Sequence, residues 1–504
     1  MKKLLLKSSI FRLLERTIVV ITSLLLTPYL ISQLGTSNYG LWILILSILG
    51  WFNVVDLGFP QAVQRQIIQA LELKDTERVN VIFSTAIMLF SALGLVSVII
   101  LVGLTQVPAI FGVTGADQLT LTHILLVLSV KILWGFLMNP FHGFFSGLLR
   151  FDIDANLSSL NAIVKALLVF WLISDLNIWG AVVATLTADV ITNLLKVFYA
   201  KRLFPSLSFK VRFVKVEEIK SLFSYSKHLV LNGLINTIGT RSAPLIITKL
   251  FDLPSLAIQQ ISANLVMHGQ AFISTITGVF LPIYNKMAAK KQNMENIFVQ
   301  TTTINIFVST ILNISLLMFG KVFIVLWVGD EFEYSYSILC FAVFSTICSG
   351  FNTSANSILL AQANHKLLSA ISFCIVAFNI PMSIYLGLQY GLIGIAMSGA
   401  LTNLIFNIYV KMALFRHYNN YKTKAIYIRL FTSIFLVYSL GLLGSYALDE
   451  LIIDTWIGLI VSGAITFPFI ILVCWLLLLD EPLKVMIFNL LADKLKLKKP
   501  LKSN

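Results

Sequence analysis

The chain contains the stretch NVIFSTAIMLFSALGLVSVIILVGL at residues 80–104, which is mostly apolar and has no charged side chain. A helix needs about 20 apolar residues to cross the hydrocarbon core of a bilayer. The run is continuous, whereas a strand of a membrane barrel alternates apolar and polar residues. A helix also satisfies its own backbone hydrogen bonds inside lipid. The stretch therefore predicts a transmembrane helix and an all-α integral membrane fold.

The connections on the two sides of this stretch differ in their basic residues. Arg65, Lys74 and Arg78 precede it, while the connection that follows carries Asp117. Cytoplasmic loops of membrane proteins are enriched in Lys and Arg, so the pattern predicts a multi-pass protein with both termini in the cytoplasm. The alternation continues along the chain, with further basic clusters at residues 201–220, 286–291, 411–429 and 484–502.

The composition agrees with a membrane protein. Hydrophobic residues make up 58% and charged residues 12% of the 504 residues, and the mean hydropathy is +0.88. A net charge of +14 would indicate nucleic-acid binding in a soluble protein. Here the cations mark cytoplasmic connections and can contact anionic membrane lipids, so no nucleic-acid partner is expected. The four cysteines lack metal-ligand spacing, and neither a cofactor nor a metal is expected.

A search of the whole chain for apolar runs of about 20 residues predicts about fourteen transmembrane helices. The first is expected to be uncleaved, because charged residues interrupt it and no cleavage site follows. The predicted spans are residues 9–34, 39–59, 80–104, 120–146, 155–174, 178–200, 220–250, 256–284, 297–319, 335–361, 367–388, 391–415, 425–447 and 455–479.

Two halves of the chain resemble each other. Three pairs of segments match in the same order at nearly constant offsets: residues 31–34 with 247–250, 146–149 with 357–360, and 178–181 with 392–395. Shared membrane composition is the alternative explanation, because apolar segments align easily. Two parallel six-helix repeats around a central cavity are an architecture found in membrane transporters. The expected organisation is an N-lobe at 1–200, a cytoplasmic linker at 201–220, a C-lobe at 221–416, two extra helices at 417–480 and a basic cytoplasmic tail at 481–504.

Several motifs resemble those of a known family. TPYLISQLGTSNYGLW at residues 27–42 resembles the junction of the first and second spans in bacterial polysaccharide flippases. Asp56-Leu57-Gly58-Phe59 followed by Arg65 resembles the exit of their second span, and LWVGDEF at 326–332 resembles the loop before their tenth. The resemblance covers nearly the whole chain and is to Wzx-like flippases of the multidrug/oligosaccharidyl-lipid/polysaccharide (MOP) exporter superfamily.

The resemblance implies a transporter in the bacterial inner or plasma membrane. Such flippases turn an undecaprenyl-pyrophosphate-linked oligosaccharide from the cytoplasmic to the outer leaflet, for assembly of O-antigen, capsule or exopolysaccharide. The partners implied are this lipid-linked substrate, membrane lipids, and the polysaccharide polymerase and chain-length regulator. The motifs identify the family and do not specify the sugar.

Charged residues inside the predicted spans are the candidates for binding the pyrophosphate. Each costs roughly 2.5–3.5 kcal/mol at the centre of a membrane and most often faces a bundle interior or a cavity. A structural ion pair, for example Lys165 with Asp189, is the alternative, and long cations near an interface can extend to the headgroups. The cationic candidates are Lys131, Lys165, Arg241, Arg16, Lys196 and Lys249.

Polar side chains also recur at helical spacing in two of the predicted spans. Asn232 and Asn236 belong to a stripe in the seventh span, and Gln260 and Asn264 to one in the eighth. Such stripes line a wet cavity suited to sugars or, alternatively, join helices by hydrogen bonds. The candidate ion-coupling residues are Asp56, Asp189, His228 and His268; His142 and His365 are expected to be packed or interfacial, although imidazole can carry protons.

The chain lacks a Walker A pattern, so transport is expected to use an ion gradient or removal of product outside and not ATP. Two alternatives remain. A cation-coupled drug or metabolite antiporter of the same superfamily would need a net acidic cavity, but Asp56 and Asp189 are outnumbered by cations. A membrane polysaccharide polymerase or ligase would be an enzyme, and neither a catalytic constellation nor a long outer loop is found. The chain is therefore expected not to be an enzyme.

Overall fold

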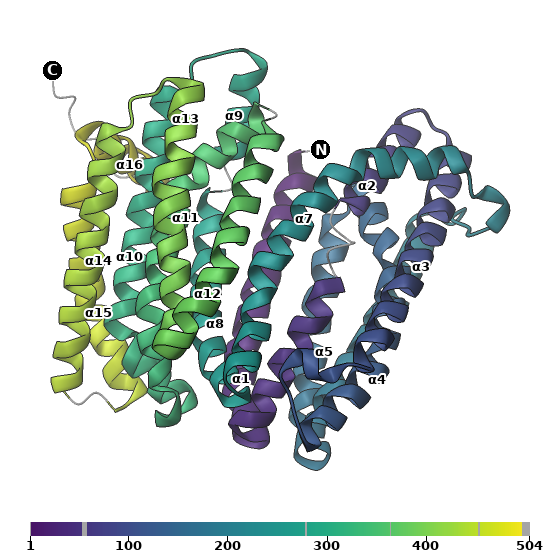
Figure 1. Cartoon of the computed structure of the whole chain (residues 1–504). Coiled ribbons are helices and arrows are strands. Elements are labelled where there is room, and N and C mark those ends of the chain that lie inside the picture. The colour runs from purple at the N-terminus through teal and green to yellow at the C-terminus, as the bar shows by residue number, and fades with distance from the viewer. Residues whose placement is uncertain (1, 53–57, 278–279, 363, 452–453, 496–504) are drawn as a thin grey trace. The chain divides into compact units, whose positions relative to one another are not determined.

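The computed structural model describes residues 2–52, 58–277, 280–362, 364–451 and 454–495. Every element in these ranges is a helix (Figure 1), which confirms the predicted all-α class. Ten of the helices are long and apolar enough to cross a membrane. The chain is therefore an integral multi-pass membrane protein, and the total of fourteen crossings stays a prediction.

Glycines bend two of the ten long helices. α1 (Lys2–Phe52) changes direction at Gly35, where φ is 72°, and α12 (His365–Thr402) changes direction at Gly391, where φ is 64°. Only glycine adopts such a conformation at little cost. Each of these helices therefore consists of two consecutive segments. The bend at Gly35 lies at the predicted break between the first and second spans, and the bend at Gly391 lies next to the predicted break between the eleventh and twelfth spans.

The described chain forms two compact units, residues 1–257 and 258–504. In the first unit, α1 contacts α5 and α7, α5 pairs with α6, and α4 packs against α2, α3 and α6. This unit extends beyond the expected N-lobe, because it also includes α7. The predicted lobe boundary at residue 200 describes the sequence repeat, and it stays a prediction. Its helices are α1, α2 (Phe59–Glu72), α3 (Thr76–Thr105), η2 (Pro108–Phe111), α4 (Ala116–Gly147), α5 (Phe151–Leu176), α6 (Ile178–Leu203), η3 (Val211–Phe213) and α7 (Val216–Leu250).

The expected linker is ordered against the N-terminal part of α3. Asn80 donates a hydrogen bond to the carbonyl of Ser206 at 3.0 Å and accepts one from the backbone N–H of Ser208 at 2.9 Å. The hydroxyl of Thr85 accepts one from the backbone N–H of Lys215 at 3.3 Å. Because Asn80 and Thr85 are buried, these bonds hold the connection between α6 and α7 firmly to α3.

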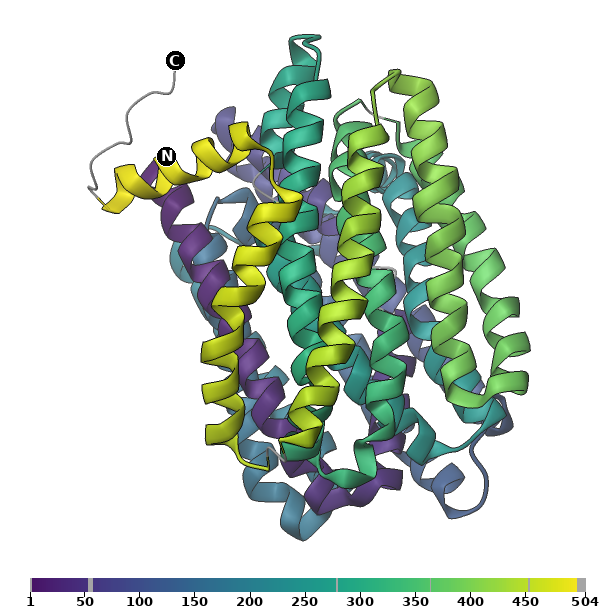
Figure 2. The same cartoon turned by 90° about the vertical axis from the view of Figure 1, so that its left-hand side faces the viewer.

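The second unit is built around α10, which contacts α11, α14 and α15. Figure 2 shows α15 and α16 in yellow, with α16 turning away from the direction of α15 at the C-terminal end of the helices. The helices are α8 (Leu253–Thr277), which begins in the first unit, α9 (Leu281–Ala289), α10 (Glu295–Val328), η5 (Asp330–Phe332), α11 (Tyr334–Ala361), α12, the π-helical segment η6 (Asn403–Val410), α13 (Lys411–Asn419), α14 (Lys424–Glu450), α15 (Trp456–Leu478) and α16 (Glu481–Leu495).

Candidate functional site

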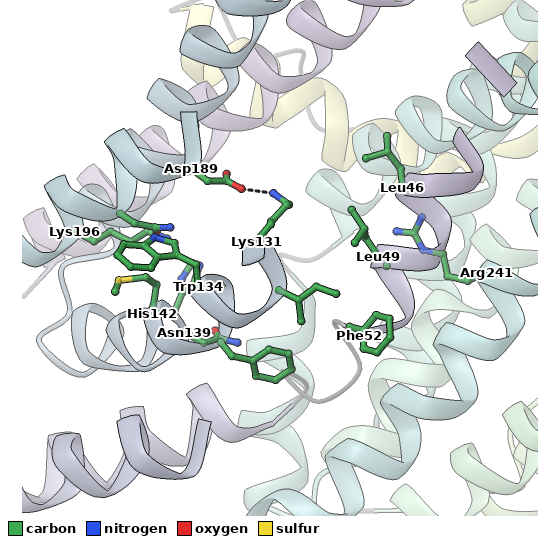
Figure 3. A pocket seen from close by; sticks show the side chains of 16 residues that line it. Leu46, Leu49, Phe52, Lys131, Trp134, Asn139, His142, Asp189, Lys196 and Arg241 are labelled. Atoms are coloured by element: carbon green, nitrogen blue, oxygen red, sulfur yellow. Dashed lines mark hydrogen bonds and ion pairs between the residues drawn. The ribbon is translucent and has the colours of Figure 1, made fainter. Parts of the chain in front are cut away.

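The first unit contains a cavity of about 620 Å³ between α1, α4, α6 and α7 (Figure 3). Apolar side chains such as Leu49, Phe52 and Trp134 form part of its wall. The charged and polar lining residues are Lys131, Asn139, His142, Asp189, Asn193, Lys196 and Arg241. Four residues that the sequence singled out, Lys131, Asp189, Lys196 and Arg241, are thus brought together at one site.

Helical spacing explains how two helices present these groups. On α4, Lys131, Asn139 and His142 lie on one face because residues three, four, seven and eight apart share a side of a helix. On α6 the same spacing aligns Asp189 with Lys196. Each helix therefore turns one polar stripe toward the cavity, while its remaining faces are largely apolar.

Lys131 and Asp189 form an ion pair across the cavity wall, from α4 to α6. The other carboxylate oxygen, Oδ1 of Asp189, accepts a hydrogen bond from the amide of Asn161 at 3.0 Å. The same amide also donates to Thr192 at 3.1 Å. The pair suggested as the structural alternative, Lys165 with Asp189, is not the one formed. Lys165 instead lies close enough to Lys131 and Asp189 to interact with both electrostatically.

Arg241 reaches the cavity from α7 beside a glycine of α1. A Cβ atom added at Gly50 would lie 2.7 Å from Nε of Arg241, which is closer than real contacts allow. The backbone carbonyl of Arg241 also accepts a hydrogen bond from the hydroxyl of Ser47 at 3.4 Å. Gly50 therefore leaves the space that the guanidinium occupies.

A second charged contact in the cavity wall was not predicted from the sequence. Nδ1 of His142 lies 2.6 Å from Oδ2 of Asp154 on α5. Oδ1 of Asp154 is buried and has no hydrogen-bond partner among the residues that the structure describes. The sequence signal for this contact is the short turn between α4 and α5. His142 and Asp154 lie at similar distances from this turn along the chain and therefore meet across it.

The structure places the other candidate residues outside this cavity lining. On the first unit, Arg16 and Lys249 are exposed, as is Asn236, and Asn232 is half-buried. In α8, the amide of Gln260 donates to Oδ1 of Asn264 at 2.7 Å, so these two amides bond to each other. Nε2 of His268 is buried without a partner among the described residues. Asp56 and the side chain of His228 lie outside the described residues. The roles of all of these residues stay predictions.

The cavity has a surplus of positive charge. Among its described lining residues, three are cations, Lys131, Lys196 and Arg241, and one is a carboxylate, Asp189. Since Lys131 is paired with Asp189, Lys196 and Arg241 supply the excess. Within the described ranges, no three His, Cys, Asp or Glu side chains are grouped as metal ligands. The arrangement suits an anion attached to a neutral polar or apolar group.

A sequence profile of the family described as polysaccharide biosynthesis protein matches residues 5–288. The uncharacterized membrane protein EpsK of Bacillus subtilis (strain 168) is 21% identical over 419 residues, which cover 77% of this chain and 78% of EpsK. Two solved structures share the fold. The lipid II flippase MurJ, in an inward closed conformation, has a TM-score of 0.68 and 16% identity and covers 88% of this chain and 98% of its own. An inward-facing multidrug resistance MATE family transporter of the MOP superfamily has a TM-score of 0.66 and 14% identity, and covers 82% and 98%.

Proposed function

Because the chain belongs to the polysaccharide biosynthesis protein family and has the fold of the MOP superfamily of transporters, we propose that it is a flippase for lipid-linked oligosaccharides. It carries undecaprenyl-pyrophosphate-linked repeat units from the cytoplasmic to the outer leaflet of a bacterial plasma membrane, for assembly of O-antigen, capsule or exopolysaccharide. The polysaccharide polymerase and the chain-length regulator are its partners on this account.

The observation that carries this proposal is the positive surplus of the cavity. A pyrophosphate is a strong anion with several acceptor oxygens, and charge-assisted hydrogen bonds from Lys and Arg are about twice as strong as neutral ones. Lys196 and Arg241 provide such donors in the cavity wall. Lys131 contributes a third cation when the anion competes with Asp189 for its ammonium group.

Neutral polar groups in the same wall suit the sugar. Asn139 and Asn193 line the cavity and are largely buried, and amides can both donate to and accept from sugar hydroxyls. The sugar-binding roles of Asn232, Asn236, Gln260 and Asn264, and the pyrophosphate-binding roles of Lys165, Arg16 and Lys249, stay predictions from the sequence, because none of these residues is in the cavity lining. The prenyl chain stays in the lipid.

Movement of the substrate follows alternating access between two lobes, driven by an ion gradient or by removal of the product outside. A cation-coupled antiporter of the same superfamily is the competing function. It fits this cavity less well, because a cationic drug requires free carboxylates and Asp189 is held by Lys131 and Asn161.

Complementation separates the two functions. The gene is expressed in a bacterium that lacks its own flippase and makes the matching repeat unit, and both surface polysaccharide and lipid-linked intermediates are measured. A flippase restores surface polysaccharide and prevents accumulation of the intermediates in the cytoplasmic leaflet. An antiporter leaves the intermediates in place and instead lowers the accumulation of a cationic dye in cells without efflux pumps.

A further inference from the structure

His142 and Asp154 form a contact that the binding of a pyrophosphate does not require. The imidazole of His142 lines the cavity and its side chain is 43% exposed, whereas the side chain of Asp154 is 21% exposed. One oxygen of Asp154 meets Nδ1 at 2.6 Å, and the other is buried without a partner among the described residues. The pair thus joins a group in the cavity to a carboxylate behind the wall.

The contact defines where a proton can be held. A carboxylate beside Nδ1 favours the imidazole tautomer whose proton is on Nδ1, and this leaves the lone pair of Nε2 as the acceptor. A proton taken from water at Nε2 converts imidazole to imidazolium and adds one positive charge to the wall. No other bond forms or breaks, and release returns the proton to water.

Charged groups from two neighbouring helices, α1 and α6, lie near this pair. From α1, Glu15 lies within electrostatic reach of both His142 and Asp154. From α6, Lys196 interacts with both Asp154 and Asp189. From α2 and α3, the apolar side chains of Val63 and Phe83 pack against α4. Lys196 therefore links the His142–Asp154 pair to the Lys131–Asp189 pair inside one cavity.

We propose that the His142–Asp154 pair is a proton-binding site that is coupled to binding of the anion in the cavity. The inference rests on the proposed function, because it takes the cavity's ligand to be an anion. An anion beside Lys196 favours the imidazolium, and the imidazolium in turn strengthens binding of the anion, since coupling between two sites is reciprocal. Asp189 is less suited to this role because Lys131 and Asn161 already hold both of its oxygens.

The test measures proton uptake when an anion binds. The full-length protein in lipid nanodiscs is titrated with inorganic pyrophosphate near neutral pH, in two buffers that differ in ionisation enthalpy, by calorimetry. The variants are His142→Gln and Asp154→Asn. The matched control is His123→Gln, because His123 lies on the same helix, is exposed and is absent from the cavity lining. Protonation of pyrophosphate itself contributes equally to all four proteins and cancels in the comparison.

Wild type and His123→Gln are expected to take up more protons per bound pyrophosphate than the two variants. Lowering the pH from about 8 to about 5 should strengthen binding by wild type about fivefold or more relative to either variant. Equal uptake by wild type and His142→Gln, with binding intact, overturns the coupling site alone. Absence of pyrophosphate binding by wild type at any pH overturns the proposed function and this inference with it. Size-exclusion profiles identify a variant that has failed to fold, and the other variant then decides.

Discussion

Lys131 of α4 and Asp189 of α6 form an ion pair in the wall of the cavity, and an amide from α5, Asn161, holds the free oxygen of the carboxylate. The ion pair and the Asn161 hydrogen bond connect α4, α5 and α6 of the first unit to one another. Under the proposed function, the pair also holds a cation that can move from Asp189 to the bound pyrophosphate. The question for experiment is which of the two roles dominates.

Replacing Lys131 with alanine should distinguish the structural role of the ion pair from its role in anion binding. The variant loses a charge-assisted contact, which costs about 1.5–3 kcal/mol of binding free energy, or roughly tenfold to hundredfold in affinity for pyrophosphate. Surface polysaccharide should be lost while membrane abundance stays near normal, Lys131→Arg should partly rescue, and Lys131→Glu should be worse than alanine. The double variant Lys131→Ala with Asp189→Ala keeps the wild-type net charge. If the double variant regains full transport, the ion pair is only structural.

Filling the space that the Arg241 side chain occupies should have the same effect as removing that side chain. Gly50→Leu puts a side chain where the guanidinium lies, so it should reduce surface polysaccharide as Arg241→Ala does. The matched control is Gly103→Leu on α3, where an added Cβ meets nothing within 4 Å. Normal display by the Gly50→Leu variant, at normal abundance, would argue that the position of Arg241 is unimportant.

Hydrogen bonds at the linker should contribute to stability. Asn80→Leu removes two bonds to the connection between α6 and α7 and leaves backbone groups unpaired, which costs about 1–3 kcal/mol of unfolding free energy. Arg78→Ala removes an ion pair of 3.7 Å whose arginine is 42% exposed, and should cost less than about 1 kcal/mol. Thermal unfolding in detergent measures both. Equal shifts for the two variants would contradict the proposed importance of the buried amide.

The alternation of basic connections predicts sidedness. In a variant without the four native cysteines, cysteines introduced at Ser37, Asp175, Asp330 and Asp449 should react with a membrane-impermeant thiol reagent in intact cells. Cysteines at Glu72, Lys210, Lys290 and Lys422 should react only after permeabilisation. Two or more sites on the opposite side would rule out the fourteen-span topology.

Much of the helical framework could be predicted because its signals are local. The runs of apolar residues predict α3, α4 and α10, and Gly35 marks the bend of α1. The separate amphipathic helix α2 was missed, because it lies in the connection after the predicted second span, where no helix was expected. A search for long apolar runs does not detect a short amphipathic helix.

The candidate site could be predicted only in part. The cost of charges in a membrane singled out Lys131, Asp189, Lys196 and Arg241, and all four line the cavity. Their pairing depends on which faces of α4 and α6 meet, and a single sequence does not contain that information. The contact of His142 with Asp154 was missed for a different reason: Asp154 lies near the start of α5, where an acidic residue is ordinarily explained by the helix dipole.

The most direct test is translocation in proteoliposomes. Undecaprenyl-pyrophosphate-linked oligosaccharide carrying a fluorescent label on its sugar is reconstituted with the purified protein, and its exposure on the far leaflet is followed by quenching. Wild type is expected to accelerate translocation over protein-free vesicles, and Lys196→Ala combined with Arg241→Ala is expected to slow it by about tenfold or more. Translocation by the double variant at the wild-type rate, or no acceleration by wild type, would contradict the proposed function.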